Sequence, residues 1–109
     1  MKLRYLRTSE PGLRWMRTCF RRHSQLDLQR AAASLRTAET VLKEHPAAGR
    51  HYEDFEAVRE FPIRNTSFSL LYTVARETVW VIDVRDQRGQ RSAEALQHFV
   101  GELTARGVD

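Results

Sequence analysis

The sequence contains little cysteine, proline or glycine. Its only cysteine is Cys19, which excludes an intrachain disulfide and a zinc site built on a cysteine cluster. Three prolines and five glycines in 109 residues exclude a collagen-like chain and a disordered chain rich in these residues. With 41% hydrophobic and 29% charged residues, the composition is that of an ordinary globular protein. At this length we expect one domain spanning residues 1–109.

Long hydrophobic runs are also missing. The longest stretch without a charge runs from Asn65 to Ala75, far short of the ~20 apolar residues that a membrane-spanning helix needs. The start of the chain has no apolar segment of the kind found in secretory signals. The four histidines (His23, His45, His51 and His98) share no metal-ligand spacing. We therefore expect a cytoplasmic protein with no membrane segment, no metal and no other cofactor.

Positive charge is concentrated at the N-terminal end. The formal charge is +4, but residues 1–36 contain nine bases and only two acids, whereas residues 37–60 contain three bases and six acids. A one-sided basic field suggests a polyanionic or acidic partner, and a solvated helix face is the alternative interpretation. Only two of the 18 bases are lysines. Arginine suits bidentate recognition of carboxylate or phosphate, although a codon-biased genome would give the same ratio.

The periodicity of the first half predicts a strand followed by two helices. Alternation over Lys2–Thr8 indicates a strand, and Ser9-Glu10-Pro11 is a helix start. The helix that follows has one apolar face and ends near His23. A second helix is predicted from about Leu26 to Glu44, with Leu28, Ala31, Leu35, Ala38 and Leu42 on one face. The short connection predicts a helical hairpin.

The second half predicts three strands and a helix. The acidic stretch up to Glu56 is interpreted as a loop. The strands are expected at Ala57–Ile63, Phe68–Val74 and Thr78–Val84, with a final helix over Ser92–Ala105. Pro62 places the first of these strands at an edge or a bulge, and the almost wholly apolar third strand is expected to be central.

Together these elements define an α+β fold. It has an N-terminal strand, an α-helical hairpin packed on one face of the sheet, a three-stranded antiparallel meander and a C-terminal helix. The first strand is expected to join the meander, because an isolated strand would leave its backbone unpaired.

The order and spacing of these segments resemble the RelE/ParE toxins of bacterial type II toxin–antitoxin modules. The resemblance covers nearly the whole chain, from Lys2 to about Phe99. It is carried by Leu42, Pro46 and Gly49-Arg50 after the hairpin, by Val58-Arg59-Glu60-Phe61, by the apolar strand containing Tyr72, and by Val79-Trp80-Val81-Ile82-Asp83-Val84 with its basic exit. It implies a toxin that an acidic, adjacently encoded antitoxin neutralises by binding.

The family contains at least two activities. ParE-type members inhibit DNA gyrase, whereas RelE-type members cut mRNA on the ribosome with basic residues on the sheet and an acid–base group near the C-terminus. The RelE basic positions fall at Ser69 and near Glu60 and Pro62 in this sequence. We therefore prefer the interpretation as a ParE-type toxin and assign no catalytic residue. A RelE-type endonuclease is the alternative. Two further hypotheses remain open. The chain could be an inactive family member that only binds its antitoxin, or a nucleic-acid-binding module, although it has no recognised DNA- or RNA-binding motif.

Roles for individual residues are hypotheses. Target contact is assigned to the late basic segment, with Arg85, Arg88 and Arg91. Antitoxin contact is assigned to the first helix, with Trp15, Arg14, Arg17, Arg21 and Arg22. A structural ion pair is expected for Asp83 with Arg85 or Arg59, because a carboxylate in an apolar strand needs a partner if buried. Tyr72 and Cys19 are interpreted as core residues.

Overall fold

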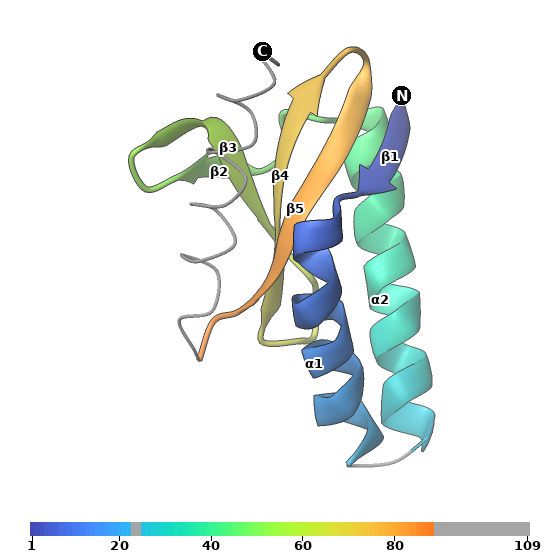
Figure 1. Cartoon of the computed structure of the whole chain (residues 1–109). Helices are drawn as coiled ribbons and strands as arrows, with labels where there is room; N and C mark the ends of the chain where they lie inside the picture. Colours follow the sequence, from blue (N-terminus) through green and yellow to red (C-terminus); the bar gives the residue numbers. More distant parts are fainter. Residues whose placement is uncertain (23–24, 89–109) are drawn as a thin grey trace.

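The fold is a five-stranded mixed sheet with two helices. The computed structural model describes residues 1–22 and 25–88. Its elements are β1 (Lys2–Tyr5), the 3-10 turn η1 (Arg7–Ser9), α1 (Glu10–Arg21), α2 (Gln25–Glu44), β2 (Arg50–Tyr52), β3 (Phe55–Pro62), β4 (Phe68–Ala75) and β5 (Thr78–Asp86). Figure 1 shows α1 and α2 side by side as a hairpin against the sheet. The predicted helix over Ser92–Ala105 lies outside the described residues.

The strand order is β1-β5-β4-β3-β2. β1 pairs with β5 in parallel, and the other neighbours are antiparallel. The structure thus confirms that the first strand joins the sheet and that the third predicted strand is internal. It corrects the expected three-stranded meander, because Arg50–Tyr52 adds a fourth antiparallel strand in a stretch that the sequence assigned to a loop. This strand is very short and is held mainly by its pairing with β3.

The helices cover one face of the sheet. Leu42, Phe68, Leu70, Val79 and Val81 form the centre of that core and are almost fully buried. Burial of a side chain of this kind stabilises a fold by roughly 1.5–3 kcal/mol. The amphipathic pattern of α2 is confirmed, since its buried residues are Ala31, Ala38 and Leu42.

A smaller cluster lies on the opposite face of the sheet. Tyr52, Val58, Leu71 and Ile82 are buried there, with Leu6 and Phe55 packed against them. A strand with apolar side chains on both faces fits the internal position of β5.

A bulge in β5 decides which side chains face the helices. Leu71 pairs with Asp83 but Tyr72 pairs with Val81, so Ile82 is an extra residue. Strict alternation from Val81 would turn Arg85 toward the helices. The bulge instead brings Val84 into the helix-side core and Asp86 to the indole of Trp15.

Candidate functional site

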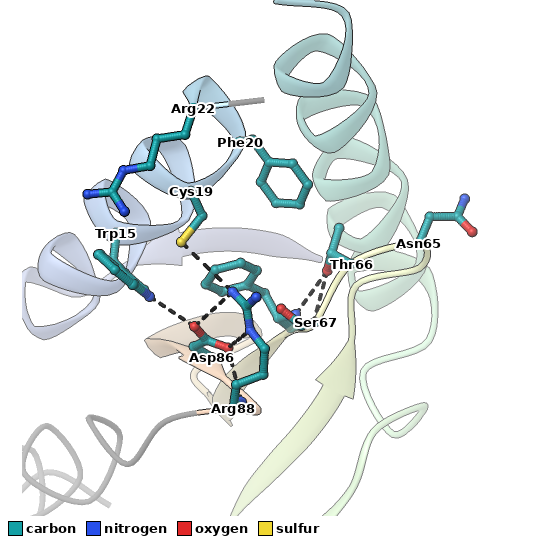
Figure 2. A pocket seen from close by; sticks show the side chains of 10 residues that line it. Trp15, Cys19, Phe20, Arg22, Asn65, Thr66, Ser67, Asp86 and Arg88 are labelled. Carbon is teal, nitrogen blue, oxygen red and sulfur yellow. Dashed lines mark hydrogen bonds and ion pairs between the residues drawn. The ribbon is translucent and has the colours of Figure 1, made fainter. Parts of the chain in front are cut away.

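An open cleft lies between α1 and the turn that leads into β4. Its volume is about 920 Å³, within the roughly 300–1,000 Å³ range of ligand-binding pockets. The lining residues are Trp15, Cys19, Phe20, Arg22, Asn65, Thr66, Ser67, Phe68, Asp86 and Arg88. Figure 2 shows their side chains arranged around this space. We call it the Trp15 cleft.

Aromatic side chains form the apolar part of the Trp15 cleft. Phe68 is buried, and its ring lies 6.0 Å from that of Phe20 in a tilted arrangement. Phe20 and Trp15 are only partly buried. Because both have ring surface that water can reach, the cleft offers apolar area that a ligand or partner could cover.

A buried carboxylate fixes one wall. Asp86 accepts a hydrogen bond from Trp15 Nε1 at 2.9 Å and bonds from the backbone and side chain of Arg88 at 3.0 Å. Burial alone would raise the pKa of Asp86, but the hydrogen bonds from Arg88 and Trp15 outweigh it and lower the pKa to about 2. Asp86 is therefore ionised at neutral pH and holds α1 against the end of β5.

Two arginines lie at the rim. The Arg22 guanidinium carbon lies 5.9 Å from the centre of the Trp15 ring, within cation–π range. The Arg88 side chain is 63% exposed, and its Nη2 lies 3.9 Å from Cys19 Sγ. The rim thus has two cationic groups, of which one is paired with Asp86.

The opposite wall is a turn with a defined hydrogen-bond pattern. Thr66 Oγ1 donates to the carbonyl of Ile63 at 2.8 Å and accepts from the backbone N–H of Phe68 at 3.0 Å. The N–H of Gln87 donates to the carbonyl of Ser67 at 2.9 Å, which joins this turn to the residue after β5. Side-chain and backbone hydrogen bonds therefore both hold this turn in place.

The residues assigned to antitoxin contact fall into separate stripes of α1. Trp15 and Arg22 lie at the Trp15 cleft. Arg14 and Arg17 line a second cleft of about 520 Å³ beside Tyr5 and Glu39. Arg21 is exposed and lines neither cleft. A single partner helix would therefore contact only some of the residues predicted to bind the antitoxin.

The second cleft contains a partly buried polar contact. The Tyr5 hydroxyl donates to Glu39 Oε2 at 2.5 Å, which links β1 to α2. Burial, followed by this hydrogen bond, raises the pKa of Tyr5 well above its ordinary value. Tyr5 is thus a permanent donor, and the contact is structural.

Of the arginines assigned to the target, the two described ones, Arg85 and Arg88, lie on different sides of the sheet. Arg85 Nη1 bonds Glu60 Oε2 at 2.9 Å, and its guanidinium lies 5.5 Å from the ring centre of Tyr52. This places it with the cluster away from the helices, whereas Arg88 is tied to Asp86 on the helix side. Arg91 lies outside the described residues.

The ion pair expected for Asp83 stays a hypothesis, and both of its expected partners contact other groups. Arg85 on β5 pairs with Glu60 on β3, across the intervening strand β4. Arg59 donates instead to the carbonyl of Gly49 at 2.6 Å, and Asp83 Oδ1 accepts from the backbone N–H of Val84 at 2.8 Å. The bulge next to Asp83 changes the face to which the following side chains point, Arg85 included.

The prediction that Tyr72 is a bonded core residue is confirmed. Its hydroxyl donates to the carbonyl of Pro46 at 2.7 Å and accepts from the N–H of Gly49 at 2.9 Å. Burial raises the pKa of Tyr72 more than the Gly49 hydrogen bond lowers it, so the hydroxyl stays protonated. A Cβ at Gly49 would lie 2.6 Å from that hydroxyl, which explains why a glycine stands there.

Sequence reasoning did not identify Asp86, Phe68, Thr66 or Ser67 as neighbours of Trp15. In the sequence, Asp86 is one acid in the basic segment that follows the last predicted strand. Its position beside Trp15 depends on the bulge in β5. The pattern Thr66-Ser67 before an apolar strand is a signal for a side-chain-capped turn. Among residues 1–22 and 25–88, no group of His, Cys, Asp and Glu could hold a metal ion. Within the same ranges, no helix is long and apolar enough to cross a membrane.

The sequence matches no family model and no curated protein. The structure is similar to that of a chain in the chromosomal ParDE TA (toxin–antitoxin) system from P. aeruginosa, with a TM-score of 0.68. The match covers 79% of this chain and 95% of that chain. At 17% identity the similarity establishes a common fold. The resemblance read from the sequence is thus confirmed in the fold.

Proposed function

We propose that this chain is the toxin of a type II toxin–antitoxin module, of the ParE type, and that it acts in the cytoplasm. The observation that carries the proposal is the ParDE fold match, which covers nearly all of the matched chain. The same family was indicated independently by the order of segments in the sequence. An acidic antitoxin encoded beside the toxin would neutralise it, consistent with the excess of basic residues over positions 1–36.

The chemistry of the sheet favours a binding toxin over a nuclease. Attack by the RNA 2′-hydroxyl needs a proton acceptor, a proton donor and cations for the phosphorane charge. Where RelE-type enzymes have basic side chains, this chain has Glu60 and Ser69. Glu60 neutralises Arg85, and the Ser69 hydroxyl accepts a hydrogen bond from the Gln87 amide at 2.7 Å. We therefore propose that free toxin binds and inhibits DNA gyrase.

For target contact we propose Arg88 and Arg91 ahead of Arg85. The Arg88 side chain is 63% exposed, whereas that of Arg85 is 27% exposed and is paired with Glu60. Arg88→Ala with Arg91→Ala should relieve growth arrest, while Arg50→Ala should not, since Arg50 is exposed on β2 at the far edge of the sheet. Undiminished arrest by the double variant would contradict this assignment.

A gyrase supercoiling assay tests the function. Purified toxin should inhibit supercoiling, and the product of the adjacent reading frame should restore it. Inhibition of gyrase that this product relieves would support the hypothesis of a ParE-type toxin. If the protein arrests growth without inhibiting gyrase, and cells making it contain cleaved ribosome-bound mRNA, the RelE-type alternative is correct. A protein that binds the adjacent product but arrests nothing would be an inactive member.

A further inference from the structure

We infer that the Trp15 cleft is the anchoring site for the antitoxin, and that it takes a large apolar side chain from a segment that also carries carboxylates. This inference rests on the proposed function for the identity of the partner. The choice of cleft and the chemistry of the segment come from the described residues around Trp15.

The apolar requirement follows from the aromatic wall. Phe68 closes the inner side, and Phe20 and Trp15 present partly exposed rings next to it. A Leu, Phe or Trp side chain placed there would remove these apolar surfaces from water, which favours binding. Bulky side chains that enter a preformed pocket are the contacts that dominate most interfaces.

The carboxylate requirement follows from the charges at the rim. Asp86 is buried and already has its donors in Trp15 and Arg88, so it offers little to a cationic partner. Arg22 and Arg88 are exposed at the rim. A carboxylate near either guanidinium would form a charge-assisted hydrogen bond, whereas a basic segment would be repelled.

The cleft is also pre-organised, which reduces the entropy lost when a partner binds. Asp86 fixes the Trp15 indole through a hydrogen bond. Hydrogen bonds of Thr66 and of the Ser67 carbonyl fix the turn on the opposite wall. The second cleft, beside Arg14 and Arg17, is smaller at about 520 Å³ and contains the acids Glu10 and Glu39. An acidic segment would therefore favour the Trp15 cleft.

Binding variants test the site directly. We would measure the affinity of purified full-length chain for the product of the adjacent reading frame by calorimetry. Ser67→Trp, which fills the cleft, and Arg22→Glu, which reverses a rim charge, should each weaken binding at least tenfold. Arg36→Glu makes the same charge change on an exposed residue of α2 outside the cleft, and Thr37→Trp adds a similar bulk on the exposed side of α2. Both controls should change affinity less than about threefold.

Cys19 provides a second readout that does not depend on a cleft variant. It is the chain's only cysteine, it is partly buried and it lines the cleft. Its reaction with a small maleimide should slow at least tenfold when the adjacent product is bound. In the control chain carrying Cys19→Ala and Thr37→Cys, the exposed thiol should react at the same rate with or without that product.

The outcomes separate the two proposals. Equal affinity of all variants, or tight binding without protection of Cys19, would overturn the anchoring site and leave the toxin–antitoxin function intact. Failure of the unmodified chain to bind the adjacent product would overturn the antitoxin assignment, and this site with it. Selective loss with Ser67→Trp and Arg22→Glu, together with protection of Cys19, would establish the site.

Discussion

The indole Nε1 of Trp15 donates a hydrogen bond to Asp86 Oδ2 at 2.9 Å, which joins the middle of α1 to the last residue of β5. This contact bridges two elements far apart in the sequence, and both residues line the Trp15 cleft. Asp86 is 8% exposed, so the bond is largely protected from water. The stability of the fold and the shape of the cleft therefore depend on the same pair.

Trp15→Phe should destabilise the protein more than Trp80→Phe. The first change removes a hydrogen bond to an ionised carboxylate, worth about 1.5–3 kcal/mol. The second removes a longer bond, 3.3 Å, from Trp80 Nε1 to the neutral carbonyl of Ala75, worth about 1 kcal/mol. Both variants lose the same side-chain volume, so the control is matched. Urea unfolding measures both, and an equal loss of free energy of unfolding would contradict the importance of the Asp86 bond.

Asp86 should make stability depend on pH in the acid range. Its pKa is lowered from 3.8 to about 2 in the folded chain. A lowered pKa stabilises the folded state above the unfolded value of 3.8, and this contribution is lost as pH falls toward 2. The two values correspond to about 2 kcal/mol at neutral pH.

Asp86→Asn keeps an oxygen for Trp15 but removes the charge. Its free energy of unfolding should be lower than that of the unmodified chain at neutral pH, and the gap should close as the pH falls from about 4 to 2. Urea titrations at a series of pH values measure this gap. A gap that stays constant across this range would show that the Asp86 charge does not stabilise the fold.

The sequence predicted most of the fold because its periodicities are strong. The apolar face of α2 and the apolar β4 and β5 are long enough for burial to dominate local preference. β2 was missed because Arg50-His51-Tyr52 has neither the length nor the alternation of a strand. Its backbone pairing with β3 decides its conformation, and that pairing is not visible locally.

The site was less predictable because it depends on register. Strict alternation along β5 cannot place Asp86 on the helix side and Arg85 on the other, and the extra residue Ile82 is what does so. No single residue marks that bulge. The ion pair of Arg85 with Glu60 was not predicted, because it joins side chains across the intervening strand β4. Trp15 was assigned to partner contact as an aromatic residue beside arginines, but its carboxylate partner lies 71 positions away and was not predicted.

Gly12→Ala should destabilise the protein although alanine favours helices. A Cβ at Gly12 would lie 2.4 Å from the carbonyl oxygen of Val84 and 2.8 Å from Asp83 Oδ1. Helix propensity alone predicts a gain of about 1 kcal/mol, whereas overpacking costs roughly 1–3 kcal/mol, and the fixed backbone of β5 makes the cost dominate. Ala33→Gly, on the exposed side of α2, measures the propensity term by itself. Thermal unfolding gives both values, and a stabilised Gly12→Ala variant would show that α1 does not pack this closely on β5.

The hairpin between β4 and β5 should be improved by replacing its two turn residues. Arg76 and Glu77 have φ values of 53° and 58°, so both adopt the left-handed conformation that a two-residue type I′ turn requires. Side chains other than Gly, Asn and Asp are disfavoured there, at roughly 1 kcal/mol per residue.

Arg76→Asn with Glu77→Gly should therefore raise the free energy of unfolding by about 1–2 kcal/mol, because Asn-Gly suits this turn. The Ala75–Thr78 pair that closes the hairpin is unchanged. In a domain of this size the gain corresponds to a rise in Tm of roughly 4–8 °C per kcal/mol. Arg76→Asn alone should give about half of it. A lower Tm in the double variant would mean that the arginine and glutamate side chains make stabilising contacts that outweigh the backbone strain.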